Sequence, residues 1–314
     1  MTMAAAGIPG LRSICADPLY EGPVPAGLSD DELSEVRRQY LGGDVEADPS
    51  IDILRWRNAI AAHDSYDELV LWLEHDLFDQ LNLIQLLSWI RVRVPVGKLV
   101  SLICIGSFPG RPAFKGLGEL LPDELASLLD TRRPVSDGEY ALAARAWGAF
   151  REPTPEALDD LRRSDTSALP FLAAALERFL QEYPSTTDGL SRTERRLLRL
   201  AAGGPVQMHS IFPRMHEDEQ SYYVTDLTLM VLVETLSRTS PPLIAFAKHP
   251  DHGDNFWHGS ISLTDAGRDA LAGRLDRVAC GVDRWLGGVH LRTGGSIWRW
   301  DDERQALAGA SISR

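Results

Sequence analysis

Ionisable side chains gather in this sequence where an apolar run gives way to an amphipathic segment. Glu74, His75 and Asp76 directly follow the apolar run 69–73, and Asp79 comes about one helical turn later. His75 and Asp79 are four residues apart, so they share one face of a helix that begins here. A histidine and a carboxylate in this relation can form an oriented acid/base pair or hold a divalent metal ion. We therefore predict that these four residues form a catalytic group.

The acids of this group also have a purely structural explanation. Carboxylates in the first turn of a helix interact favourably with the helix dipole and accept hydrogen bonds from its free N–H groups. This explanation covers Glu74, Asp76 and Asp79, but it does not cover His75. The sequence leaves both interpretations open, and it also leaves open whether a metal ion binds at His75 and Asp79.

The flanking segments predict a sheet that positions the group. The run 69–73 has the length of a strand buried on both faces, residues 77–91 carry apolar side chains at helical spacing, and residues 98–105 form a second buried strand. A strand, a helix and a strand joined this closely predict a βαβ unit with parallel strands. We expect an α/β domain with a small, Rossmann-like parallel sheet, whose ligands bind outside the carboxyl ends of the strands.

Five further residues are predicted to bind a ligand. Gly106 and Ser107 end the second strand, and Gln80 lies on the helix. Glu21 belongs to a turn-forming stretch whose acids point into the crevice or lie in a solvated loop. His290 belongs to a C-terminal segment that covers a pocket or packs on the first domain. Ser107 has the alternative of an ordinary turn serine, because no P-loop or Gly-x-Ser-x-Gly pattern surrounds it.

The chain before the first strand is predicted to be rich in loops, with a short strand at 12–16 and two helices. Ser29, followed by Glu32 three residues later, is a capping box that starts a helix reaching about Leu41. A second helix is expected over 51–62.

Composition limits the classes of function. A chain of 314 residues with 44% hydrophobic and 25% charged residues is typical of a globular protein with two or three domains. The net charge of −13 argues against binding along a nucleic-acid backbone, and no apolar run reaches the roughly 18 residues of a membrane span. Three widely spaced cysteines and an N-terminus without a secretory signal predict a cytoplasmic protein.

The second half of the chain changes from helices to a mixed pattern. After a helical stretch, the breaker at 184–189 is followed by three helices, a β-hairpin (243–248 and 257–263) and another helix from Thr264, which is the layout of a winged helix. The segment Ile261–Arg268 resembles the strand-to-helix step after the wing in bacterial winged-helix regulators. The predicted division is an α/β domain at 1–121, a helical linker region at 122–187 and a winged-helix-like α+β domain with a C-terminal hairpin at 188–314.

The helix that would read DNA in this arrangement, 225–236, contains no Lys or Arg and is apolar nearly all round. We therefore expect it to pack against another domain. His249, His252 and His258 lie in and beside the hairpin loop at a spacing that leaves zinc binding open, although no cysteine is nearby. A second hairpin is predicted from 289–291 and 297–300.

Several segments together resemble a family of bacterial proteins known as domain of unknown function 1835. The resembling segments are Glu21–Leu28, Leu71–Leu81, Gly116–Leu120, Asp188–Glu194 and Leu286–Leu291. They span nearly the whole chain. The resemblance implies an architecture, but it implies no reaction, because the family has no established one.

Two classes of function stay open. The protein is an enzyme that uses acid/base or metal-assisted chemistry on a small polar ligand, or it is a non-catalytic adaptor or regulator whose winged-helix half meets a protein partner. The sequence identifies no cofactor, and it leaves open a homo-oligomer. Nucleic acid and membrane are not expected as partners.

Overall fold

The computed structural model describes residues 3–42, 53–251, 253 and 255–312 of the chain. It is a mixed α/β structure with small sheets, and it divides into two compact units. The first unit comprises Met1–Leu176 and Gly287–Val289, and the second comprises Glu177–Leu286 and His290–Arg314. The predicted three-part division remains a prediction; residues 122–176 here belong to the first unit.

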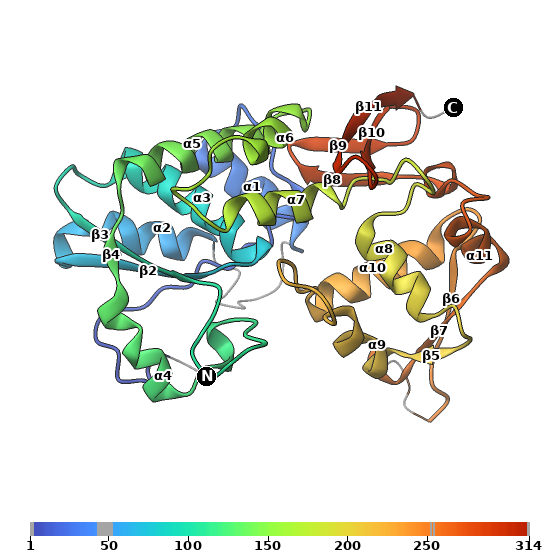
Figure 1. The fold of residues 1–314 in the computed structure, drawn as a ribbon, viewed down its shortest axis with the longest axis horizontal. Coiled ribbons are helices and arrows are strands. Elements are labelled where there is room, and N and C mark those ends of the chain that lie inside the picture. Colours follow the sequence, from blue (N-terminus) through green and yellow to red (C-terminus); the bar gives the residue numbers. More distant parts are fainter. Residues whose placement is uncertain (1–2, 43–52, 252, 254, 313–314) are drawn as a thin grey trace. The chain divides into compact units, whose positions relative to one another are not determined.

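The first unit is built around a short sheet with helices before and after it (Figure 1). Its elements are β1 (Gly22–Pro23), α1 (Asp30–Tyr40), α2 (Ile53–Ala61), β2 (Glu68–Glu74), α3 (Leu77–Arg93), β3 (Leu99–Ile105), α4 (Pro122–Ser127), β4 (Arg133–Pro134), α5 (Asp137–Arg151), α6 (Glu156–Arg163) and the start of α7 (Leu172–Leu180).

Strands β2 and β3 are parallel, as the βαβ prediction required. Their register runs from Glu68 opposite Leu99 to Glu74 opposite Ile105, and α3 connects them. The sheet has a third strand that was not predicted, because β4 pairs antiparallel with β3 inside the segment expected to be all helical. The carboxyl ends of β2 and β3 therefore lie at the same edge of the sheet.

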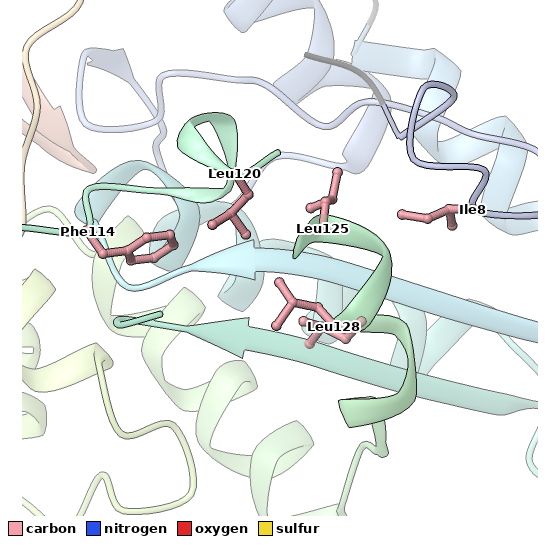
Figure 2. Packing of buried hydrophobic residues seen from close by; sticks show 6 residues of the cluster. Ile8, Phe114, Leu120, Leu125 and Leu128 are labelled. Carbon is pink, nitrogen blue, oxygen red and sulfur yellow. The ribbon is translucent and has the colours of Figure 1, made fainter. Parts of the chain in front are cut away.

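Successive side chains of β2 point to opposite faces of the sheet. Leu71 and Leu73 are buried, and α3 packs on this strand. Val70 and Trp72 pack against a separate core cluster of Ile8, Ile103, Phe114, Leu120, Leu125 and Leu128, whose side chains gather beside the two strands in Figure 2. Glu74 has the same parity as Val70 and Trp72, so the pleat directs its side chain toward the segment that carries Phe114 and Leu120.

A distant piece of the chain completes the first unit. Gly287 accepts a hydrogen bond from the Val24 N–H (2.8 Å), and the Gly288 N–H donates to the Phe150 carbonyl at the end of α5 (3.0 Å). A Cβ on Gly288 would lie 1.9 Å from the Arg151 carbonyl oxygen, so only glycine permits this approach.

After α7, the described part of the second unit contains four helices, a three-stranded sheet and two further strand pairs. Its elements after α7 are α8 (Arg192–Leu200), β5 (Val206–Gln207), α9 (Met208–Met215), α10 (Asp226–Arg238), β6 (Ile244–Ala247), β7 (Ser260–Leu263), α11 (Asp265–Leu271), β8 (Asp283–Gly287), β9 (Val289–Arg292), β10 (Ser296–Asp301) and β11 (Ala306–Ile312). The tip of β8 and β9 belongs to the first unit. The predicted hairpin is present as β6 and β7, and β5 adds to it in the order β5-β7-β6.

One predicted strand and one predicted strand pairing are wrong. Residues 12–16 form no strand. Segments 289–291 and 297–300 are strands, but they do not pair with each other: β9 pairs with β8, and β10 pairs with β11. The prediction took no account of β8 and β11, which are the strands that β9 and β10 pair with.

The predicted capping box at Ser29 and Glu32 is confirmed, and it starts α1. The predicted second helix is α2 (Ile53–Ala61), while Ile51 and Asp52 lie outside the described residues. No helix in the described ranges combines the length and the apolar character needed to cross a membrane.

Candidate functional site

The turn from β2 into α3 holds three carboxylates in a chain of short contacts. Asp76 is the N-cap of α3, and its Oδ1 accepts a hydrogen bond from the Asp79 N–H (2.9 Å). Asp79 Oδ2 in turn accepts a hydrogen bond from the Glu74 N–H (2.6 Å). The capping explanation therefore holds for Asp76, while Asp79 fixes the end of the preceding strand.

Glu74 is the member of the group whose carboxyl leaves the turn. Its Oε1 accepts a hydrogen bond from the Leu117 N–H (2.6 Å). A Cβ on Gly116 would lie 2.1 Å from Oε2, so the absent side chain of Gly116 makes room for the carboxyl. Burial raises the pKa of Glu74 to about 7; the Leu117 hydrogen bond opposes this rise, and the charges of Asp76 and Glu119 add to it.

The other two carboxyls are also harder to ionise than usual. Burial raises the pKa of Asp76, and burial together with the charges of Asp76 and Glu74 raises the pKa of Asp79 well above its ordinary value. Among the described residues, no Lys or Arg side chain forms an ion pair with any of the three. This edge of the sheet is therefore an acidic site whose three carboxyls keep their protons to a higher pH than ordinary carboxyls do.

Gln80, in the first turn of α3, holds the two strands that carry the site. Its side chain is buried, and its Nε2 donates to the Glu74 carbonyl (2.7 Å) and to Cys104 Sγ (3.4 Å). Gln80 thus holds the end of β2 against β3. We interpret it as a positioning residue, whereas the sequence indicated a ligand contact.

His75 and Gly106 lie side by side at the edge, as the parallel pairing requires. The His75 ring lies 6.4 Å from the Phe114 ring and 6.0 Å from the Phe171 ring, measured between centroids. A Cβ on Gly106 would meet Phe171 at 2.7 Å and His75 Cβ at 3.1 Å, so this position has no room for a side chain. Ser107 follows with an exposed side chain, so the structure brings Glu74, His75 and the end of β3 together.

Glu21 and His290 have other surroundings. The Glu21 carbonyl accepts a hydrogen bond from Arg37 Nη1 (2.5 Å). His290 belongs to the second unit, where its ring stacks on Trp285 at 4.4 Å and its Nε2 lies 2.7 Å from Asp283 Oδ1. The contact of Glu21 is thus made by its backbone, and those of His290 are made within its own unit.

Sequence reasoning missed the partners of Glu74. Gly116, Leu117 and Glu119 were noted as part of a resembling segment, but not as site residues. The signal was Gly116, because a glycine can mark a backbone that another group approaches closely.

The described residues contain no group of three or more His, Cys, Asp or Glu side chains placed to hold a metal ion. His252 and Asp254 of the histidine-rich loop lie outside these residues. The rings of His249 and His258 are 6.4 Å apart.

Comparison with known proteins gives no match: no family model, no curated protein and no solved structure is similar to this chain. The resemblance to domain of unknown function 1835 remains a prediction.

Proposed function

We propose that the first unit is a Rossmann-like enzyme domain that binds a small polar ligand at the carboxyl ends of β2 and β3, and that Glu74 transfers protons there. One observation carries this proposal: Glu74 is a largely buried carboxyl at that edge whose partner is a backbone N–H and, among the described residues, no cation, which brings its pKa to about 7. Near that pH both of its protonation states are populated, as a general acid/base requires.

The neighbours of Glu74 fit this role. The Leu117 N–H orients Oε1, and Asp79 fixes the Glu74 backbone. His75 lies beside Gly106, so it offers a ligand a second group that can carry a proton. Ser107 is exposed at the same edge and offers a hydroxyl. We place the protein in the cytoplasm.

Ligand-dependent thermal shifts test the proposal. Purified protein is screened against small polar metabolites, beside Glu74→Gln, which keeps the acceptor for the Leu117 N–H, and His75→Ala. The expected result is a ligand that stabilises the parent and loses that effect in Glu74→Gln. Stabilisation that survives in both variants would contradict the assignment. Glu217→Gln, an exposed acid in the second unit, is the control.

A second candidate is a winged-helix-like adaptor, and the surface of α10 favours it. Leu227, Met230 and Val231 are exposed on this helix, and a cavity of about 530 Å³ beside its start is lined in part by Phe212 and Trp257. Apolar surface of this kind is typical of a binding face for a protein or a second copy. Light scattering of the parent and Met230→Glu tests a homo-oligomer: a mass that falls to one chain in the variant supports this candidate.

A further inference from the structure

The first unit has a cavity of its own among its helices. The α3 residues that line it come from the second half of that helix, away from the site at its start. The cavity has a volume of about 210 Å³. Four helices line it: α1 contributes Asp30 and Leu33, α2 Arg57, α3 residues between Gln85 and Arg93, and α5 Trp147. This is smaller than the roughly 300 Å³ at which drug-sized pockets begin, so it suits a small molecule.

Arg57 is a buried cation beside this cavity. The residue is 6% exposed, and its Nη1 donates to the Asp30 carbonyl (2.7 Å) and to Ser34 Oγ (2.5 Å). Neither acceptor carries a charge, and no carboxylate of the described residues forms an ion pair with Arg57. Its Nε is buried and has no hydrogen-bond partner among those residues. Buried charges in proteins are normally paired, but within the described residues no anion is bonded to this guanidinium.

Asp30, whose backbone carbonyl binds Arg57, has a carboxylate that is already engaged. Asp30 Oδ2 accepts hydrogen bonds from Trp89 Nε1 (3.1 Å) and from Arg93 Nη2 (2.9 Å). The charged side chains of the lining are therefore one acid and two arginines, and the acid is bound to one of them. Burial lowers the pKa of Arg57, although the charges of Asp30 and Asp31 oppose this. A negative charge in the cavity would relieve that cost.

Gln85 provides a second incomplete polar group. It is 4% exposed, and its Oε1 is buried without a hydrogen-bond partner in the described part of the chain. A buried acceptor of this kind calls for a donor. Gln85 Oε1 and Arg57 Nε are both shielded from solvent. A ligand therefore reaches each of these atoms only when the side chain that carries it rotates.

The remaining lining is apolar. Trp89 and Trp147 present indole rings, and Leu33 and Val92 present aliphatic groups. We propose that this cavity binds a small aromatic carboxylic acid, with its carboxylate on the Arg57 guanidinium, its ring between the tryptophans and a hydroxyl donating to Gln85. The geometry is independent of the proton-transfer role proposed for Glu74.

Titration of the full chain with 4-hydroxyphenylacetate tests this proposal. The NMR signals of the tryptophan indole N–H groups report the binding. Saturable binding with a shift of the Trp89 signal is expected. Phenylacetate should bind more weakly, since it lacks the hydroxyl for Gln85. 4-Hydroxyphenylacetamide, which has the same shape without the charge, should bind at least about tenfold more weakly. Equal binding of the acid and the amide, or no binding of the acid, would overturn the proposal.

Two variants separate binding from folding. Arg57→Gln should weaken the acid at least about tenfold and leave the amide unchanged. If Arg57→Gln does not fold, Ser88→Leu decides, because it fills the cavity from α3 and keeps Arg57. Loss of acid binding in a folded Ser88→Leu protein supports the site, and binding equal to the parent excludes it. Thermal shifts of the Glu74→Gln protein with the same acid should match those of the parent.

Discussion

Both units bury glutamate carboxyls, and they treat them in opposite ways. In the second unit, the Glu182 side chain is 3% exposed and lies 2.7 Å from Arg178 Nη1 and 3.1 Å from Arg284 Nη2, with Thr193 also bonded to it. Burial acts to raise the pKa of Glu182, but the two arginine charges outweigh it and bring the value to about 2. In the described part of the first unit, no such cation pairs with Glu74, and its pKa is about 7.

The contrast shows that the partner, more than the depth of burial, decides which form of a carboxyl the fold prefers. Glu182 is held as an anion in a network in which Arg178 also binds Glu219 (2.9 Å) and stacks on Tyr222. Such a group stabilises one packing and has no proton to exchange near neutral pH. Glu74 lacks the stabilisation of such an ion pair, but it can change its protonation state near neutral pH.

Removing the central cation of the network should have the largest effect. Arg178→Met leaves Glu182 and Glu219 buried without their shared partner, so we expect a loss of about 3–5 kcal/mol in the free energy of unfolding. Urea unfolding with hydrogen exchange in the second unit measures it. Arg238→Met is the control, because its pair with Glu234 is exposed at both ends (76% and 56%) and should cost less than about 0.5 kcal/mol. Equal losses in the two variants would break the comparison.

The second prediction concerns the slope of stability with pH above 4.5. The folded pKa of Glu74 is raised from 4.5 to about 7, so its stabilising contribution is fully present below pH 4.5 and is lost as the pH rises through about 7. Glu74→Gln removes this loss. Relative to the parent, the variant should gain on the order of 2 kcal/mol between pH 4.5 and pH 8. Urea unfolding at both pH values gives the difference, and a constant offset would contradict the prediction.

The third prediction is the opposite slope in the second unit. Because the folded pKa of Glu182 is lowered from 4.5 to about 2, its contribution is present above pH 4.5 and is lost as the pH falls through about 2. Lowering the pH toward 2 should therefore reduce the hydrogen-exchange protection around Glu182. The same change should not reduce the contribution of Glu74, which is fully present below pH 4.5. Simultaneous loss at both places would show that the two carboxyls do not differ as described.

The smallest effect tests a neighbour of Glu74. Since the charge of Glu119 raises the pKa of Glu74, Glu119→Gln should lower that pKa slightly. The carboxyl carbon of Glu74 can be titrated by NMR in both proteins. Glu156→Gln on α6, an exposed acid, should leave the titration unchanged. A rise in the pKa of Glu74 in Glu119→Gln would refute the electrostatic account.

Local signals made part of this structure predictable. The capping box of Ser29 and Glu32 and the apolar runs of β2 and β3 depend on residues close in sequence, and these elements are present. The predicted pairing of β9 with β10 was wrong, because β9 pairs with β8 and β10 pairs with β11, and residue types alone did not reveal these partners.

The candidate site divides in the same way. Glu74, His75 and Asp76 stand out in the sequence because they interrupt an apolar pattern. The Leu117 N–H that binds Glu74 is 43 residues away and is brought there by the pleat of β2 and the core around Phe114. The direction of the pKa change of Glu74 could not be predicted from the sequence, because it depends on whether the fold places a cation beside the carboxyl.

The contact of Gly287 and Gly288 with the end of α5 has a consequence for biosynthesis. The first unit cannot acquire its last piece until the ribosome has added residues 177–289. At about 5–20 residues per second, this delay is on the order of ten seconds. During that time the hydrogen bonds from Val24 to Gly287 and from Gly288 to Phe150 cannot form. A chain that ends before Gly287 would therefore leave the ribosome with an incomplete first unit.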